Sequence, residues 1–166
     1  FIGFRGAGKT TLASALAEQL QQPVLSTDVL IETAAGQAIS EYVLLYGWPA
    51  FRALERSVIH ELAGTDHTII DCGGGVVEQA DVMAVLCALG TIVWVDAEPD
   101  DIYRRLASSS GRPLLSTDDL RSDIDLHYTR RKPLYARYSN VYVNTSQNTV
   151  AECRAQILNG IQTDSL

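Results

Sequence analysis

The residues with the clearest chemical meaning lie at the start of the chain. Residues 3–10, GFRGAGKT, have the composition and spacing of a phosphate-binding loop, in which the N–H groups of a glycine-rich turn surround phosphate oxygens. In this pattern Lys9 places a positive charge over the β- and γ-phosphates, and the hydroxyl of Thr10 is suited to binding Mg²⁺. The motif therefore predicts a nucleotide site, but it does not define the reaction. The nucleotide-binding residues predicted in this segment are Gly6, Ala7, Gly8, Lys9, Thr10 and Thr11.

A loop of this kind connects a buried strand to a helix, and the rest of the sequence continues that alternation. Short runs rich in β-branched and aromatic residues predict strands at residues 1–4, 23–25, 68–71, 91–96 and 141–144. Longer amphipathic stretches predict helices at residues 10–21, 29–35, 40–46, 49–62, 79–89, 100–107, 120–138 and 149–161. Alternating elements of this kind are typical of an α/β protein with a parallel sheet.

The overall composition disfavours several classes of protein. Hydrophobic residues make up 46% of the 166 residues and charged residues 20%, which is enough apolar material for a packed core. No apolar run approaches the roughly 18–20 residues of a membrane span. The net charge of −7 disfavours direct nucleic-acid binding, which needs excess positive charge. Cys72, Cys87 and Cys153 have no metal-binding spacing and are expected to be buried thiols of a reducing compartment, so we predict a cytoplasmic protein.

Beyond the first loop, motifs along the whole chain resemble those of the shikimate kinases. In order they are STDVLIE at residues 26–32, GWPAFR at 47–52, GGG at 73–75, GRPLL at 111–115 and RRKPLY at 130–135. The resemblance implies that Asp28 contacts the acceptor hydroxyl and that Arg112 reaches the transferring phosphate, so both join Lys9 as catalytic residues. The substrate-binding residues that it implies are Asp28, Arg52, Gly73, Gly74, Gly75 and Arg131, with both arginines holding the shikimate carboxylate.

The resemblance also implies an architecture and further contacts. The expected fold is a three-layer P-loop kinase fold, with a five-stranded parallel sheet in the order 2-3-1-4-5, helices on both faces and a lid at residues 108–118. The expected activity is ATP-dependent phosphorylation of shikimate to shikimate 3-phosphate in aromatic amino-acid biosynthesis, with ATP and Mg²⁺ as cofactors. Arg105 is expected beside the adenine, and residues 146–148, with Asn148, are expected at its edge.

These residues are chemically consistent with transfer of a γ-phosphoryl group to an alcohol. Such a transfer needs neutralised phosphate charge, an oriented hydroxyl and exclusion of water. Lys9, Mg²⁺ and Arg112 meet the first need, Asp28 meets the second, and a closing lid meets the third. The planar fork of a guanidinium group binds a carboxylate bidentately, which suits the two arginines to a small carboxylate ligand.

One position departs from the family pattern. Shikimate kinases usually carry Asp-x-Asp at the end of the second strand, and the first aspartate helps to hold hydrated Mg²⁺. Here that position is Ser26. The predicted strand at residues 68–71 instead ends in Asp71, where these kinases commonly carry an uncharged residue. We therefore hypothesise that the magnesium carboxylate has moved from the second strand to the third, which makes Thr10 and Asp71 the predicted metal-binding residues; the alternative is that Asp71 is only a polar strand end.

Some segments are especially similar to one branch of relatives. FRGAGKTT at residues 4–11, CGGGVVE at 72–78 and RRKP at 130–133 resemble the kinase domain of the fungal pentafunctional AROM polypeptide. The quinate-pathway repressor is related to that polypeptide and retains kinase-like sequence. A regulatory module that binds ligand without turnover, and is nuclear, is therefore one alternative, and a P-loop kinase for another small hydroxy acid is a second.

The sequence also leads to an expectation about domain organisation. Residues 1–166 are expected to form a single shikimate-kinase-like domain. The first predicted strand is short, so we expect either that a few residues precede Phe1 or that the domain belongs to a longer polypeptide with other domains.

Overall fold

Short parallel strands form the centre of the computed structural model, which describes residues 1–108 and 119–164. Strand β1 (Val24–Ser26) pairs with β2 (Ile69–Asp71), and β3 (Val93–Asp96) pairs with β4 (Val141–Asn144), both in parallel. The register of the first pair sets Ser26 directly beside Asp71. Strands β3 and β4 are almost entirely buried, as expected for strands covered on both faces.

The first two residues of the chain link the two strand pairs. Phe1 makes backbone hydrogen bonds of 2.7 and 3.1 Å to Ile70 and Cys72, at β2. Ile2 makes two bonds of 2.9 Å to β3. The strand predicted at residues 1–4 is reduced to one isolated bridge at Ile2, because the chain turns into the phosphate-binding loop at Gly3.

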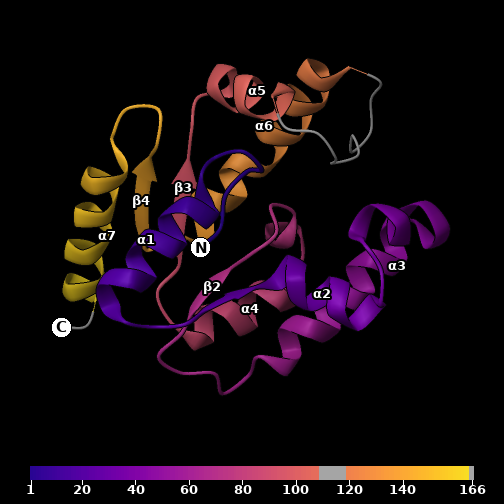
Figure 1. Ribbon diagram of the computed structural model, residues 1–166, viewed down its shortest axis with the longest axis horizontal. Coiled ribbons are helices and arrows are strands. Elements are labelled where there is room, and N and C mark those ends of the chain that lie inside the picture. Colours follow the sequence, from indigo (N-terminus) through magenta and orange to yellow (C-terminus); the bar gives the residue numbers. More distant parts are fainter. Residues whose placement is uncertain (109–118, 165–166) are drawn as a thin grey trace.

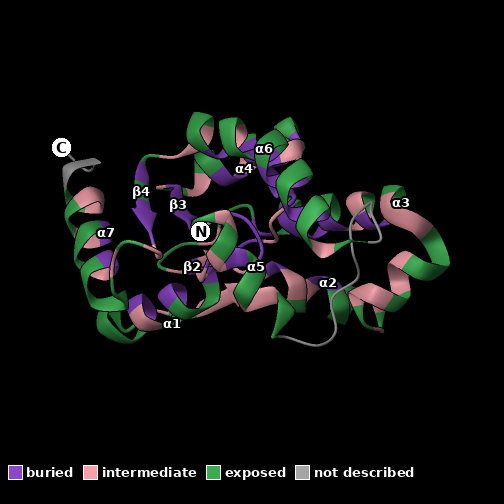
Figure 2. Ribbon diagram, turned by 90° about the horizontal axis from the view of Figure 1, so that it is seen from above, coloured by how far each residue is buried: buried purple, intermediate pink, exposed green. Residues whose placement is uncertain are grey.

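Helices cover both faces of the strands. Figure 2 shows α4 (Ala80–Leu89) and α6 (Leu120–Tyr138) above the strands and α1 (Lys9–Leu20) below them. Helix α7 (Val150–Asp164) packs against α1 and β4, and α5 (Pro99–Ala107) packs against α6. The main core lies between these layers and includes Leu12, Leu16, Met83, Val95, Tyr135 and Ile157. This layered arrangement is an α/β fold.

Helices α2 (Thr27–Ala35) and α3 (Ile39–Glu61) extend to one side of the layers (Figure 1). They share a smaller core of Ile31, Phe51 and Val58. Helix α3 is broken at Gly47, whose φ of 81° and ψ of 168° are not helical, and Pro49 follows. The two helices predicted at residues 40–46 and 49–62 are therefore the two halves of α3, separated where glycine permits the break.

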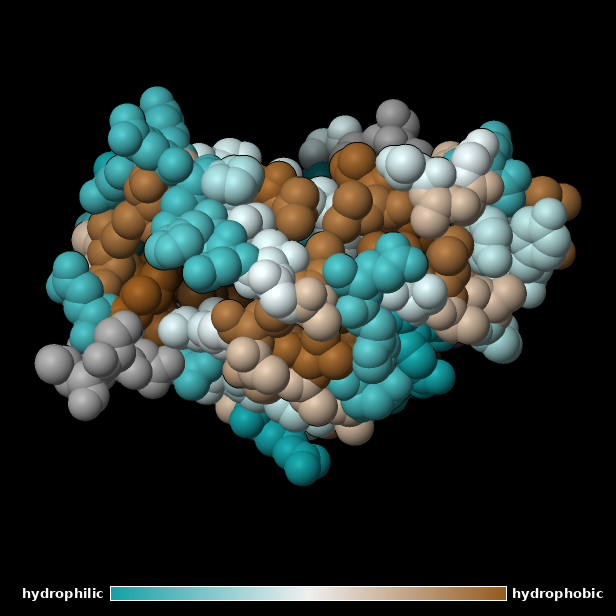
Figure 3. Space-filling view, turned by 90° about the horizontal axis from the view of Figure 1, so that it is seen from below, coloured by the Kyte–Doolittle hydropathy of each residue, from teal (hydrophilic) through white to brown (hydrophobic). Residues whose placement is uncertain are grey.

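The structure tests the predictions about the burial of the cysteines and about membrane-spanning segments. Cys72 and Cys153 are buried as predicted, but Cys87 is exposed, so the prediction for Cys87 was wrong. Its position on α4 turns away from the core, which periodicity within an apolar helix did not indicate. In the part of the chain that the structure describes, no helix has both the length and the apolar character of a membrane-spanning segment. On the face shown in Figure 3, apolar and polar side chains are intermixed.

Candidate active site

A cavity of about 870 Å³ opens where β1 and β2 end. The carboxyl ends of parallel strands are the usual place for ligand sites in α/β proteins. The predicted site residues that line it are Gly6, Gly8, Lys9, Thr10, Thr11, Asp28, Arg52, Asp71, Gly73, Gly74, Gly75, Arg105 and Arg131. Ala7 is buried in the loop itself, and Asn148 is not among the lining residues. Arg112 and residues 109–118 of the predicted lid lie outside the described residues.

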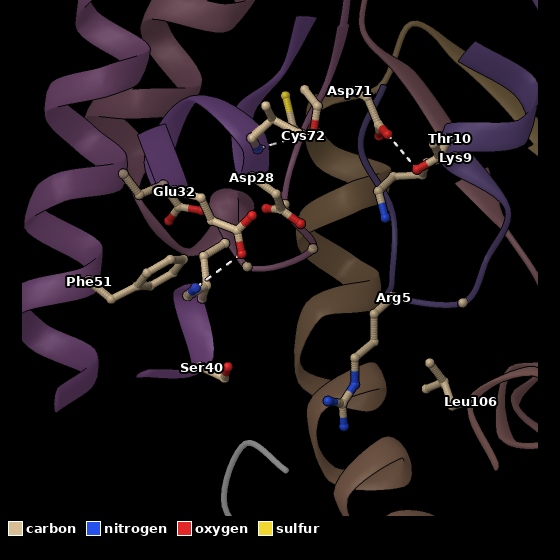
Figure 4. Close-up of a pocket in the computed structure, with 18 of the residues that line it drawn as sticks. Arg5, Lys9, Thr10, Asp28, Glu32, Ser40, Phe51, Asp71, Cys72 and Leu106 are labelled. Atoms are coloured by element: carbon tan, nitrogen blue, oxygen red, sulfur yellow. Dashed lines mark hydrogen bonds between the residues drawn. The ribbon is translucent and has the colours of Figure 1, made fainter. Parts of the chain in front are cut away.

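The phosphate-binding loop has the conformation that its glycines allow. Gly6 and Gly8 have φ values of 79° and 97°, in the left-handed region that other residues disfavour. Helix α1 begins at Lys9, immediately after the loop, so its positive dipole end faces the cavity. The Nζ of Lys9 donates to the carbonyl of Phe4 at 3.2 Å, and Figure 4 shows this side chain projecting into the cavity. These features together form an anion-binding pocket.

The side chain of Arg105, on α5, also contacts the phosphate-binding loop. Its guanidinium donates to the carbonyl of Gly6 at 3.0 Å and to Oγ1 of Thr145 at 2.9 Å. The Thr145 hydroxyl in turn donates to the carbonyl of Ala7 at 2.8 Å. The side chain of Asn148 donates to the carbonyl of Asn144 at 3.0 Å. Arg105 and Thr145 therefore join α5 and the end of β4 to the loop.

Thr10 and Asp71 meet at the inner end of the cavity. The Thr10 hydroxyl donates to Oδ2 of Asp71 at 2.6 Å, as Figure 4 shows. Asp71 is buried at the end of β2, beside Ser26 at the end of β1. A hydroxyl and a carboxylate next to a phosphate loop are the oxygen donors that Mg²⁺ takes in nucleotide sites, where phosphates and water complete its shell. In the described ranges no group of three or more His, Cys, Asp or Glu residues is placed to hold a metal.

Asp28 lies in the first turn of α2 and projects into the same cavity (Figure 4). The hydroxyl of Ser26 caps this helix by accepting from the Val29 N–H at 3.4 Å, which sets where the first turn begins. Gly73 faces Asp28 closely: a Cβ at Gly73 would lie 3.0 Å from Oδ1 of Asp28 and 3.2 Å from Oε1 of Glu55. That Oε1 is buried and, among the described residues, has no hydrogen-bond partner. The glycine therefore leaves space between two acidic side chains for a ligand that donates hydrogen bonds.

Arg52 is held in place by Glu55, one helical turn along α3. Its NH1 donates to Oε2 of Glu55 at 2.5 Å, and the amide of Gln79 donates to the same oxygen at 2.7 Å. Burial raises the pKa of Glu55, while the positive charge of Arg52 opposes that rise. A Cβ at Gly75 would lie 2.0 Å from NH2 of Arg52, so a larger residue there would displace the guanidinium from this position. The ring of Phe51 lies 5.1 Å below Arg52.

Arg131 approaches from α6 on the other side of the glycine run. It is almost fully buried, and its guanidinium lies 5.9 Å from the ring centroid of Phe4. One turn further along the helix, the hydroxyl of Tyr135 donates to the carbonyl of Gly74 at 2.5 Å. The helix and the glycine run are thereby joined, and Arg131 and Arg52 line the same cavity from two different helices.

The sequence analysis missed several residues that build this site. Thr145 ties the loop to Arg105, the hydroxyl of Thr27 accepts from the Gly73 N–H at 3.0 Å, and Arg5 forms a buried ion pair with Asp123 of α6. Glu78, within the predicted glycine-run motif, contacts Arg131 at 2.9 Å. Each of these contacts joins residues at least 40 positions apart, so local spacing contained no signal for them. In fold and site, the protein has the arrangement of a P-loop nucleotide-binding protein.

Comparison with known proteins identifies the family. A sequence profile of the shikimate kinase family matches residues 5–162. The shikimate kinase of Symbiobacterium thermophilum is 33% identical over 164 residues, covering 97% of this chain and 94% of that protein. The shikimate kinase of Microcystis aeruginosa is 35% identical over 162 residues, covering 98% of this chain and 85% of that protein. The chain belongs to the shikimate kinase family.

Solved structures agree with this assignment. The structure of the shikimate kinase from Acinetobacter baumannii in complex with shikimate superposes with a TM-score of 0.91 at 28% identity, covering 99% of this chain and 92% of that one. The structure of the shikimate kinase from Aquifex aeolicus superposes with a TM-score of 0.84 at 26% identity, covering 99% and 96%.

Proposed function

We propose that the protein transfers the γ-phosphoryl group of ATP to a hydroxyl of shikimate, giving shikimate 3-phosphate and ADP. The observation that carries the proposal is that one cavity is lined by the phosphate-binding loop, by Asp28 and by the two arginines Arg52 and Arg131. The loop suits the nucleotide phosphates, and the arginines suit a carboxylate. Asp28, between them in the cavity, suits the hydroxyl that is phosphorylated.

The proposed reaction assigns a role to each group. Asp28 orients the acceptor hydroxyl and accepts its proton while the oxygen bonds to the γ-phosphorus and the bond from that phosphorus to the bridging oxygen breaks. Lys9 and the dipole of α1 stabilise the charge on the phosphate oxygens. Arg112, which lies outside the described residues, is proposed to reach the same phosphate; its support is the sequence motif alone.

The nucleotide contacts follow from the same proposal. Gly6, Ala7, Gly8, Lys9, Thr10 and Thr11 are proposed to surround the phosphates. Arg105 is proposed to lie beside the base, with Asn148 at its edge; the position of Arg105 in the cavity lining supports the first contact. We also propose that residues 1–4 serve as the central strand of a five-stranded sheet in the order 2-3-1-4-5, which the bonds of Phe1 to β2 and of Ile2 to β3 support. A particular closeness to the fungal AROM domain or to the quinate-pathway repressor stays a prediction from the motifs.

Mg²⁺ fits the donors at the inner end of the cavity. We propose that Thr10 and Asp71 hold it, since their oxygens lie 2.6 Å apart beside the phosphate loop. When bound, Mg²⁺ neutralises phosphate charge. Asp71 takes the place of the missing carboxylate at Ser26, because the two positions are register partners on adjacent strands.

The proposed role of Asp71 as a magnesium ligand leads to a prediction for the variant Asp71→Asn. The Mg²⁺ concentration needed for half-maximal ATP binding is expected to rise about tenfold or more, because a neutral amide is a weaker partner for the cation. Titration of nucleotide binding against Mg²⁺ measures this directly. Adding Ser26→Asp to the Asp71→Asn variant is expected to restore most of the Mg²⁺ dependence. An unchanged titration in Asp71→Asn contradicts the placement.

Acceptor recognition makes a second prediction, for Arg52→Lys. The KM for shikimate is expected to rise about 10- to 100-fold, because an ammonium group cannot reproduce a bidentate guanidinium contact. The Kd for ATP is expected to stay within about twofold. Arg56→Lys is a matched control, since Arg56 lies one turn along α3 and pairs with exposed Asp81 at 2.7 Å, away from the cavity. Equal losses of shikimate and ATP affinity would assign Arg52 a general role in folding.

A coupled assay of ADP release with shikimate and ATP tests the proposed function as a whole. Shikimate-dependent release with formation of shikimate 3-phosphate supports it. Titrations of nucleotide and of shikimate accompany the assay. Binding of both ligands without turnover would favour the regulatory alternative, and turnover with a different hydroxy acid alone would favour the other kinase.

A further inference from the structure

The arginines assigned to the acceptor already contact a carboxylate of the chain itself. Glu78 is the last residue of the short helix η1 (Val76–Glu78), which follows the glycine run. NH2 of Arg131 donates to Oε2 of Glu78 at 2.9 Å, and Arg130 forms an ion pair with the other carboxylate oxygen. NH2 of Arg52 lies 3.9 Å from Oε2, too far for a hydrogen bond but close enough for charge attraction. Glu78 is therefore a counter-ion shared by three arginines.

This contact lies at the edge of the active-site cavity. A smaller cavity of about 210 Å³ is lined by Trp48, Arg52, Glu78, His127, Arg130 and Arg131. Trp48, Arg52 and Arg131 also line the large cavity, so the two hollows share a wall. Glu78 is 22% exposed, which leaves its carboxylate within reach of ions that enter.

The groups around this wall have a simple charge balance. Three guanidinium groups face two carboxylates, Glu78 and the Glu55 that holds Arg52, which leaves one positive charge. Burial alone would raise the pKa of Glu78, but the hydrogen bond from Arg131 and the charges of the arginines hold that pKa below its usual range, so the side chain is charged at neutral pH. Burial and the positive charge of Arg131 lower the pKa of His127, which is therefore neutral there.

The arginines still have donors to offer. The Nε of Arg131 is buried and, within the described ranges, has no hydrogen-bond partner. NH2 of Arg52 does not hydrogen-bond to Glu78 at its distance of 3.9 Å. An entering carboxylate can therefore accept from NH2 of Arg52 without displacing Glu78, but it does so at a short distance from a like charge. The repulsion grows with the number of negative charges that the ligand carries.

We propose that Glu78 determines the charge selectivity of the acceptor site: together with Glu55 it leaves the group of three arginines with one positive charge, which matches a monocarboxylate and disfavours dianions. The inference rests on the proposed function for the identity of the acceptor, and it adds a selectivity determinant that does not itself bind the acceptor. Glu78 acts through Arg131 and Arg52 on any anion that enters.

Glu78→Gln tests the proposal, because glutamine keeps the shape and an acceptor for Arg131 while removing the charge. The probes are benzoate, with one carboxylate, and benzene-1,3-dicarboxylate, with two, titrated calorimetrically into protein whose phosphate loop is filled with ADP. In Glu78→Gln the Kd of the dicarboxylate is expected to fall about tenfold or more and that of benzoate about threefold, so the ratio of the two Kd values changes. The KM for shikimate is expected to fall with benzoate, while kcat and the Kd for ATP stay within about twofold.

Two further variants separate charge from structure. Glu78→Asp keeps the charge and is expected to keep a ratio near that of the parent protein. Asp81→Asn removes one negative charge from exposed α4, where Asp81 pairs with Arg56, and is expected to leave the ratio unchanged. An unchanged ratio in Glu78→Gln, or a higher KM for shikimate, overturns the proposal. If the parent protein fails to bind shikimate at all, the proposed function fails, whereas the two benzene carboxylates still test Glu78.

Discussion

Replacing Lys9 with alanine is expected to lower kcat for shikimate phosphorylation about 100- to 1,000-fold, the cost of removing one group that stabilises transition-state charge. The side chain is nine-tenths buried at the start of α1, and it projects into the cavity beside the phosphate loop. Phosphoryl transfer depends on positioning and electrostatics, so loss of this charge is expected to affect the rate far more than the fold. Steady-state kinetics with ATP and shikimate measure the effect.

The chain provides a matched control for this variant. Lys132 is the other lysine, and it lies exposed on α6 with its Nζ 5.2 Å above the ring of Tyr128. Lys132→Ala is expected to leave kcat within about twofold, as is usual for exposed positions. Near-normal turnover in Lys9→Ala would contradict the placement of catalysis at the phosphate-binding loop.

Asp28→Asn is expected to lower kcat about 100- to 10,000-fold, the range for loss of a general base. Asparagine has nearly the same size as aspartate and fits in the space that Gly73 leaves, but it cannot accept the proton of the acceptor hydroxyl. The KM for shikimate and the Kd for ATP are expected to change much less than kcat. Rapid-quench measurement of the first turnover separates this chemical step from product release.

An exposed carboxylate serves as the control for Asp28. Asp125 lies on α6 and pairs with Arg121 at 3.2 Å, outside the cavity lining. Asp125→Asn is expected to have normal kinetics. If Asp28→Asn lost shikimate binding while the bound fraction reacted at the normal rate, Asp28 would be a binding group and not the proton acceptor.

Most of the fold was readable from local patterns. Periodicity correctly predicts the strands at residues 68–71 and 141–144 and the helix at residues 120–138. In each segment the hydrophobic residues follow one pattern throughout, and polar residues or turns mark both ends. The segment at residues 1–4 was less readable, since its pairing depends on β2 and β3 and not on its own residues. The exposure of Cys87 was missed because nearly all of α4 is apolar, which leaves little periodicity to show the buried face.

The candidate site was readable only in part. The phosphate-binding loop depends on neighbours in the chain, so its glycines and Lys9 were identified with their roles. The Asp71 carboxylate was also predicted, but its hydrogen bond with Thr10 at 2.6 Å joins the end of β2 to the start of α1, 61 residues apart in the chain. Glu78 belongs to the segment CGGGVVE that the sequence analysis quoted. Its ion pairs with three arginines of α3 and α6 could not be predicted from that segment.

The sequence by itself determined which groups are available: a phosphate loop, a carboxylate in the first turn of a helix, two arginines and a glycine run. It could do so because each of these depends on residues within a few positions of one another. The tertiary structure decided which of these side chains lie next to one another. Arg52 lies beside Glu55 and Glu78, and Asp71 lies beside Ser26 on the adjacent strand. Those distances follow from the packing of α3, α6 and the strands, and electrostatic interactions depend on distance in space and not on separation along the chain.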